Sequence, residues 1–249
     1  MTVHADRAAS PAPACTARGR GRQALTLFIF AAGATSAATP AAAQLGTVVS
    51  LFSDDRFRGY SLSEERPVAI FDLSYDLPDG FYAAASASAV AAREGVRPLG
   101  LQLNGGYARR LNSRLTLDVG AIHSTYSRYS GLTGARDYTE FYAGIAGHNI
   151  SSRISVSPGY FRAGPTVHGE VDAHYALSRR LSVAGNVGLL LPLGRNYSAR
   201  PVYDARLGLD RDFGRLSLHA AITSRGAGSS IYQGRSDRHA LVLGASYRL

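Results

Sequence analysis

Apolar and polar residues alternate with a period of two along most of this chain. From Ala69 to Leu77 the odd-numbered residues are apolar, whereas Asp72, Ser74 and Asp76 on the other side are polar. The pattern recurs at 115–121, 167–177, 207–210, 216–222 and 241–249. Successive side chains of a strand point to opposite faces, so this period predicts strands with one apolar face. No strong 3.6-residue stripe competes with it, and we therefore expect an all-β fold.

The connections between these strands alternate in length. Short joints at 78–80, 111–114, 148–149, 178–180 and 211–214 are typical of tight hairpin turns. Longer polar stretches lie between them, at 61–66, 92–98, 127–137, 158–165, 194–201 and 226–238. Outer-membrane barrels are built in this way, with short periplasmic turns and longer extracellular loops. The alternation predicts a closed antiparallel transmembrane β-barrel of about twelve strands, with both ends on the periplasmic side.

The period of two does not by itself decide which face of the strands points outward. A membrane barrel must close, because hydrocarbon cannot satisfy open backbone edges, and its outside is apolar while its lumen is wet. The alternating apolar face from Leu241 to Leu249 is typical of the last strand of such a barrel. Signals for the outer-membrane assembly machinery usually end in an aromatic residue, whereas this strand ends in Leu249. The resemblance to such a signal is therefore partial.

The N-terminus has the three parts of an export signal. Four arginines lie between residues 7 and 22, and residues 24–32 form an apolar run that is too short to span a bilayer. Small residues before Gln44 fit a signal-peptidase site, so we expect cleavage after Ala43 and a single barrel domain at 44–249. The alternatives are a disordered leader on a cytoplasmic protein and a lipoprotein. The order of the three parts disfavours the first, and the lack of an apolar run before Cys15 disfavours the second.

The chain is basic, with a formal net charge of +9, and all of its 27 basic residues are arginine. Nucleic-acid-binding proteins cluster such residues among stacking aromatics. Here the arginines are scattered near turns and loops, so a nucleic-acid partner is not expected. Their excess hints at tolerance for anions, but contacts from loop arginines to the phosphates of outer-leaflet lipopolysaccharide explain it equally well. The single cysteine excludes a disulfide scaffold and a zinc ribbon.

Two blocks of sequence resemble a known family. Residues 53–63, Ser-Asp-Asp-Arg-Phe-Arg-Gly-Tyr-Ser-Leu-Ser, together with 72–75 and 80–83, resemble the opening of the TorF-like porins, a Gcw-type family of bacterial proteins of uncharacterised function. Residues 138–144 resemble its second block, and weaker similarity covers most of 44–249. The resemblance implies an outer-membrane barrel and a pore. The family supplies no catalytic residues.

Polar residues line the lumen if the apolar faces point to lipid. Both signs of charge are present there, so these side chains either select a permeating solute or pair across the lumen as a plug. We predict a porin-like channel for passive diffusion of small polar solutes or ions across the outer membrane of a Gram-negative cell, without catalytic residues, cofactor or metal. The expected lumen residues are Asp72, Gln102, Asn104, Asp118, Glu140, Arg153, His168, Glu170, Asp172, His174, Asn186, Asp204, Arg206, Asp210 and His219.

Two rival functions assign chemistry to some of these residues. His168, Glu170, Asp172 and His174 project to one face of a strand, but a zinc site would need partners from neighbouring strands, because same-face residues lie about 7 Å apart. An outer-membrane hydrolase would need a nucleophile beside a histidine, and the candidates by proximity are His123 with Ser124 and His219 with Ser224. Neither a Gly-x-Ser-x-Gly elbow nor a His-Glu-x-x-His motif is present.

A third rival is a non-conducting barrel with a structural or adhesive role. Aromatic residues in or near the long loops suit contact with a partner at the cell surface. They equally suit an aromatic girdle at the membrane interface. These residues are Tyr126, Tyr129, Tyr160, Phe161, Tyr197 and Tyr232.

Overall fold

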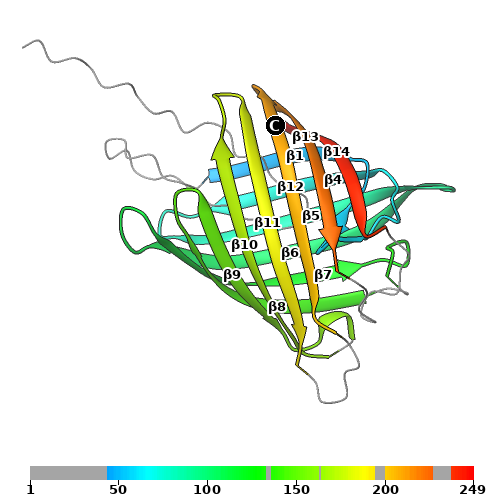
Figure 1. Cartoon of the computed structure of the whole chain (residues 1–249), viewed down its shortest axis with the longest axis horizontal. Helices are drawn as coiled ribbons and strands as arrows, with labels where there is room; N and C mark the ends of the chain where they lie inside the picture. Colours follow the sequence, from blue (N-terminus) through cyan, green and yellow to red (C-terminus); the bar gives the residue numbers. More distant parts are fainter. Residues whose placement is uncertain (1–43, 133–135, 163, 194–199, 227–236) are drawn as a thin grey trace, which may run out of the picture.

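A computed structural model describes residues 44–132, 136–162, 164–193, 200–226 and 237–249. Twelve antiparallel strands close into one barrel, which confirms the predicted fold (Figure 1). The expected signal peptide, residues 1–43, lies outside the described residues. In the described ranges no helix is long and apolar enough to cross a membrane. The barrel strands are β1 (Gln44–Phe52), β4 (Val68–Asp76), β5 (Phe81–Ala92), β6 (Gly95–Arg110), β7 (Thr116–Tyr126), β8 (Arg136–Ala146), β9 (Ile150–Ser157), β10 (Thr166–Ala176), β11 (Leu181–Pro192), β12 (Val202–Phe213), β13 (Leu216–Arg225) and β14 (His239–Arg248).

The first strand closes the barrel. On one side β1 pairs with β4, from Gln44 opposite Asp76 to Phe52 opposite Val68. On its other side it pairs with β14, where Val48 lies opposite Arg248. Every other strand pairs with its neighbour along the chain. The ring leaves no open strand edge, which is the condition for placing strands in hydrocarbon.

The two ends of the barrel differ in their connections. At one end, here called the turn end, the strands are joined at 77–80, 111–115, 147–149, 177–180 and 214–215. At the other end, the loop end, connections at 53–67, 127–135, 158–165, 193–201 and 226–238 are longer. One predicted loop is wrong: residues 92–98 belong mostly to β5 and β6, which are joined only by Arg93 and Glu94. Gly95, with φ +103°, helps to turn the chain there.

The outward face of the barrel is apolar. Leu207 on β12, Ile222 on β13 and Leu241 on β14 lie in register, and each is about three-fifths exposed. A continuous exposed apolar band of this kind is unfavourable in water but not in contact with lipid. Near the turn end the band carries exposed aromatic rings, as expected of a girdle at a membrane interface. These rings belong to Tyr75, Phe81, Tyr175, Phe213 and Tyr247.

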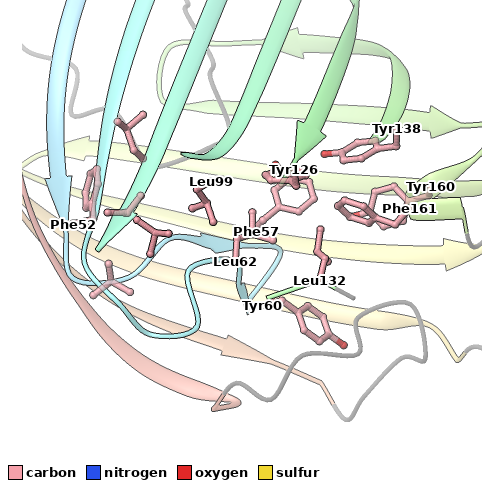
Figure 2. Packing of buried hydrophobic residues seen from close by; sticks show 14 of the residues in the cluster. Phe52, Phe57, Tyr60, Leu62, Leu99, Tyr126, Leu132, Tyr138, Tyr160 and Phe161 are labelled. Atoms are coloured by element: carbon pink, nitrogen blue, oxygen red, sulfur yellow. The ribbon is translucent and has the colours of Figure 1, made fainter. Parts of the chain in front are cut away.

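The inward face is not uniformly polar. Near the loop end, side chains from strands around the ring and from three connections form one buried apolar cluster inside the barrel (Figure 2). We call it the inner core. Its members are Phe52, Phe57, Tyr60, Leu62, Val68, Ile70, Val90, Leu99, Tyr126, Leu132, Tyr138, Tyr160, Phe161, Leu190, Val202 and Val242, none more than 6% exposed. The polar lining predicted from sequence therefore gives way to a packed apolar layer at this end.

Candidate pore and its plug

All fifteen residues predicted for the lumen lie on the inward faces of their strands. Eleven of them are less than a tenth exposed. The other four, Asp172, His174, Asn186 and Arg206, are half-buried. A wide water-filled channel would leave such side chains exposed to water. Their burial indicates that side chains largely fill the middle of the lumen.

One polar network joins the five strands from β5 to β9 across the inside of the barrel. The Tyr82 hydroxyl donates to Asp118 Oδ1 at 2.6 Å and lies beside the hydroxyl of Tyr142, which in turn donates to Asn104 Oδ1 at 3.1 Å. The Arg153 guanidinium lies 3.5 Å from Asp118 Oδ2 and 4.0 Å from the ring centroid of Tyr142. Because β5 and β7 are not neighbours in the sheet, these contacts must run across its concave side.

A second group lies on β10, β11 and β12. His168 is 3.9 Å from Glu170 and 3.8 Å from Asp204, both measured from ring nitrogen to carboxylate oxygen. The His168 and Asp204 side chains meet over Gly188, where an added Cβ would lie 2.7 Å from Asp204 Oδ2 and 2.8 Å from His168 Nε2. His174, which the metal hypothesis included, is not among them. Within the described residues no group of three or more histidine, cysteine, aspartate or glutamate side chains is arranged to hold a metal ion.

A hydrogen-bond relay crosses the seam of the barrel. His219 Nδ1 lies 2.7 Å from Asp210 Oδ1, and its Nε2 lies 3.0 Å from Ser246 Oγ, which is 2.8 Å from Ser50 Oγ. The relay joins β12, β13, β14 and β1, so it ties the last strands to the first. Sequence reasoning missed both serines, although each occupies an inward position of its strand. Ser224, the predicted partner of His219, lies on the opposite face of β13.

The other candidate pair of the hydrolase hypothesis does not converge either. His123 points outward and its Nδ1 lies 2.9 Å from Thr139 Oγ1 on β8. Ser124 is fully buried on the inward face and accepts a hydrogen bond from Gln102 Nε2 at 3.1 Å. Adjacent residues of a strand face opposite ways, so a histidine and the next serine cannot converge on one substrate.

The connection from β1 to β4 folds into the lumen. Within it, β2 (Arg56–Phe57) and β3 (Tyr60–Ser61) form a small hairpin, and we call residues 53–67 the plug. Gly59 at its tip has φ +76°, and a Cβ there would lie 2.7 Å from Arg225 Cβ on β13. Only glycine combines this backbone conformation with such a close approach. The tip therefore rests against the wall of the barrel.

Charged contacts fix the plug on two sides. Arg58 Nη2 donates to both carboxylate oxygens of Glu140 on β8, at 2.8 and 3.0 Å. Its guanidinium also lies 4.6 Å from the ring centroid of Phe57 and 5.0 Å from that of Tyr160. On the other side, Arg225 of β13 lies 4.1 Å from the ring centroid of Tyr60. The plug thus reaches walls that are separated by several strands of the ring.

Arg56 holds the internal shape of the plug. Its Nε donates to Asp54 Oδ2 at 2.6 Å, and its Nη1 donates to the backbone oxygens of Gly59 at 3.1 Å and Asp237 at 2.8 Å. The hydroxyls of Ser61 and Ser63 both donate to Asp54 Oδ1. A buried charge with this many partners is well satisfied, so the plug has a defined fold of its own.

The loop aromatics belong to this plugged interior. Tyr126, Tyr160 and Phe161 are at most 3% exposed, and Phe161 lies 4.5 Å from Tyr138 between ring centroids (Figure 2). For these three residues both sequence readings, surface adhesion and interface girdle, are wrong, because the rings pack inward against the plug. Tyr129 is partly buried against the same inner core. Tyr197 and Tyr232 lie outside the described residues.

Asp55 is a buried carboxyl in the plug. Burial raises its pKa from the ordinary 3.8 to about 7, with smaller upward contributions from the Asp54 and Asp72 carboxylates, while Arg206 lowers it. Neither of its carboxylate oxygens has a hydrogen-bond partner. The docked plug therefore favours a proton on Asp55 more than an undocked plug would.

The docking of the plug is expected to weaken as pH rises. Below the pKa that Asp55 has in the undocked plug, Asp55 is protonated in both states, so docking is strongest. Between about pH 4 and pH 7 only the docked plug keeps the proton on Asp55, and each increase in pH therefore weakens docking. Limited proteolysis at Arg56 and Arg58 should be faster at about pH 8 than at about pH 5. Asp55→Asn removes the titration and should make cleavage equally slow at both values, after correction for the protease's own pH dependence. An equal pH effect in this variant would contradict the assignment.

The geometry defines a class: a closed, twelve-stranded barrel of the outer-membrane porin type, with an apolar outside and a charged interior. A family model described as "Bacterial protein of unknown function (Gcw_chp)" matches residues 32–243, and the chain belongs to this family. Among curated proteins compared by sequence, none matches this chain.

Solved porin structures share the fold at low sequence identity. The NanC porin superposes with a TM-score of 0.54 at 13% identity, covering 83% of this chain and all of that one. The KdgM porin in complex with disordered oligogalacturonate has a TM-score of 0.52 at 12% identity, covering 82% and 98%. The COG4313 outer membrane channel from Pseudomonas putida F1 has a TM-score of 0.51 at 14% identity, covering 85% and 97%. At these identities the likeness concerns the fold alone.

Proposed function

We propose that this protein is an outer-membrane channel for passive diffusion of small polar solutes or ions, of the TorF-like kind, and that residues 53–67 close it. The observation that carries the proposal is the charged inward face of a closed barrel whose outward face is apolar. Charged side chains in a hydrocarbon environment are costly unless they border water or one another. A lumen lined by both signs suits the passage of polar solutes once its plug moves.

The proposal includes the route and surroundings of the chain. Residues 1–43 act as a cleaved signal peptide, the assembly machinery inserts the barrel, and lipopolysaccharide contacts its loop end. Short turns support a periplasmic turn end. No enzymatic step and no cofactor is part of this function.

The oligogalacturonate found in complex with the KdgM porin is not proposed as a solute of this protein. Oligogalacturonate is a chain of carboxylates, and it is named for that protein. An anionic polymer would meet Glu140, Glu170 and Asp204 on the wall of this lumen. We therefore restrict the proposed solutes to small molecules and ions.

Single-channel recording tests the proposed function. Residues 44–249, refolded and inserted into a planar bilayer, should give discrete and reproducible current steps separated by long closed periods, because the plug is docked in most molecules. An absence of current steps in long recordings, both from this protein and from a variant whose plug is removed, would overturn the proposal.

The packed interior is the observation that favours a second candidate. A barrel whose middle is filled by ion pairs and whose loop end is filled by the inner core would serve a structural or adhesive role if the plug never moved. Silence of both proteins in the same experiment would support this alternative.

A further inference from the structure

The interior of the barrel is acidic although the chain as a whole is basic. In the described part of the chain, the charged side chains of residues that are less than a tenth exposed comprise eight carboxylates and three guanidiniums. With every carboxylate counted as charged and histidines counted as neutral, this is a formal excess of five negative charges inside a chain of net charge +9. The residues are Asp54, Asp55, Asp72, Asp118, Glu140, Glu170, Asp204 and Asp210 against Arg56, Arg153 and Arg225.

Most of the excess belongs to the wall. The plug supplies two of the buried carboxylates, Asp54 and Asp55, and one of the buried guanidiniums, Arg56. The other six carboxylates and two guanidiniums lie on the strands, which therefore carry a formal excess of four negative charges. They remain in place whether or not the plug is docked.

Two guanidiniums of the wall, those of Arg153 and Arg206, lie among carboxylates. Arg153 lies within 4.0 Å of both Asp118 and Glu170. Arg206 has no hydrogen-bond partner for its Nε. The carboxylates that act on its charge by electrostatic attraction are those of Asp210 and Asp55. An anion that enters the lumen would have to compete with these fixed carboxylates for the same arginines.

Several wall carboxylates retain unused acceptor oxygens. The Oδ2 atoms of Asp172, Asp204 and Asp210 have no hydrogen-bond partner. The side chains of Asp204 and Asp210 are only 9% and 7% exposed, so these oxygens face the interior. Asp172 lies on β10, and Asp204 and Asp210 lie on β12, on the other side of β11. This part of the wall can accept the hydration shell of a cation or a cationic group.

We propose that the channel prefers cations, and that Asp172 and Asp204 on β10 and β12 set this preference. The inference rests on the proposed function and names its solute class as small cations and cationic polar solutes. Fixed charges beside a low-dielectric wall attract mobile ions of the opposite sign more strongly than exposed charges do in bulk water. The positive charges of the rest of the chain lie largely in turns and loops, where salt screens them.

Reversal potentials in a potassium chloride gradient test the proposal. The protein and a variant with residues 53–67 replaced by an Asn-Gly turn should both favour potassium over chloride. Asp172→Asn with Asp204→Asn should lower the potassium-to-chloride permeability ratio by about two- to threefold in both backgrounds. Asp79→Asn with Glu94→Gln is the matched control, because it removes two charges in connections outside the lumen and should leave the ratio unchanged.

The outcomes separate this inference from the proposed function. Channels that favour chloride, or whose permeability ratio is the same in the lumen variant and the control, would overturn cation preference while leaving the channel itself intact. Silence of both the plugged and the plug-free proteins would overturn the channel function and this inference with it. A compact, heat-modifiable band on a gel shows that each variant has folded, so that silence is not a failure of refolding.

Discussion

Replacing residues 53–67 with an Asn-Gly turn is expected to raise the mean conductance of the barrel at least severalfold. Phe52 and Val68 lie opposite each other at the ends of β1 and β4, so a tight hairpin turn can join these strands without changing their register. The replacement removes the ion pair of Arg58 with Glu140 and three side chains of the inner core. Planar-bilayer recording of the two proteins under the same salt conditions measures the difference.

Two control variants identify the cause of such a rise. Replacing Arg93-Glu94 with Asn-Gly leaves the plug intact and changes only the tip of the β5–β6 hairpin, so the conductance of this variant should match that of the parent protein. Arg58→Ala with Glu140→Gln removes one anchor of the plug and leaves no unpaired buried charge, so it should give an intermediate conductance. If the plug-free barrel conducts no more than the parent, residues 53–67 are not the barrier.

The plug could not be predicted from sequence because its contacts are distant along the chain. Phe57, Tyr60 and Leu62 are apolar residues in a connection, which is a local sign of burial, but nothing local shows that they turn into the barrel instead of toward the membrane. Arg58 and Glu140 are 82 residues apart. The two sequence blocks that carry the family resemblance, 53–63 and 138–144, meet through this ion pair and through the rings of Phe57 and Tyr138, 6.1 Å apart.

The strands and their faces were predictable because alternation is a local property. Predicted inward residues on the same strand are separated by an even number of positions, so one correctly assigned strand orients all of its side chains. Alternation does not, however, predict where a strand ends and a turn begins. Val96 and Arg97 continue a strand through a stretch that the sequence predicts as a polar loop, because they pair with Ala91 and Val90 of β5 beyond the alternating pattern.

The side-chain contacts across the lumen could not be predicted from the sequence either. The inward position of His219 on β13 was expected, but its partners Asp210 and Ser246 come from the two neighbouring strands and depend on the register between them. A shift of one residue in either pairing would turn the partner outward. Only the closed sheet determines which inward residues meet.

Leu207→Arg is expected to destabilise the barrel in lipid by about 2–4 kcal/mol. Leu207 lies on the outward face of β12, midway between the exposed aromatic residues Tyr203 and Phe213, so it should lie near the centre of the bilayer. An arginine there must bring its charge into hydrocarbon or extend it to an interface. Urea titrations of folding into lipid vesicles measure the loss.

Leu216→Arg is the matched control for depth, because it makes the same replacement on the outward face at the turn end of β13. Near a membrane interface the arginine reaches water and lipid phosphates, so the expected loss is only about 0–1 kcal/mol. In a barrel that folded in water, both substitutions would replace an exposed leucine with a soluble side chain and neither would be costly. A large difference between the two variants therefore follows only if the apolar band is immersed in lipid, whereas equal and small losses would contradict the membrane assignment on which the channel depends.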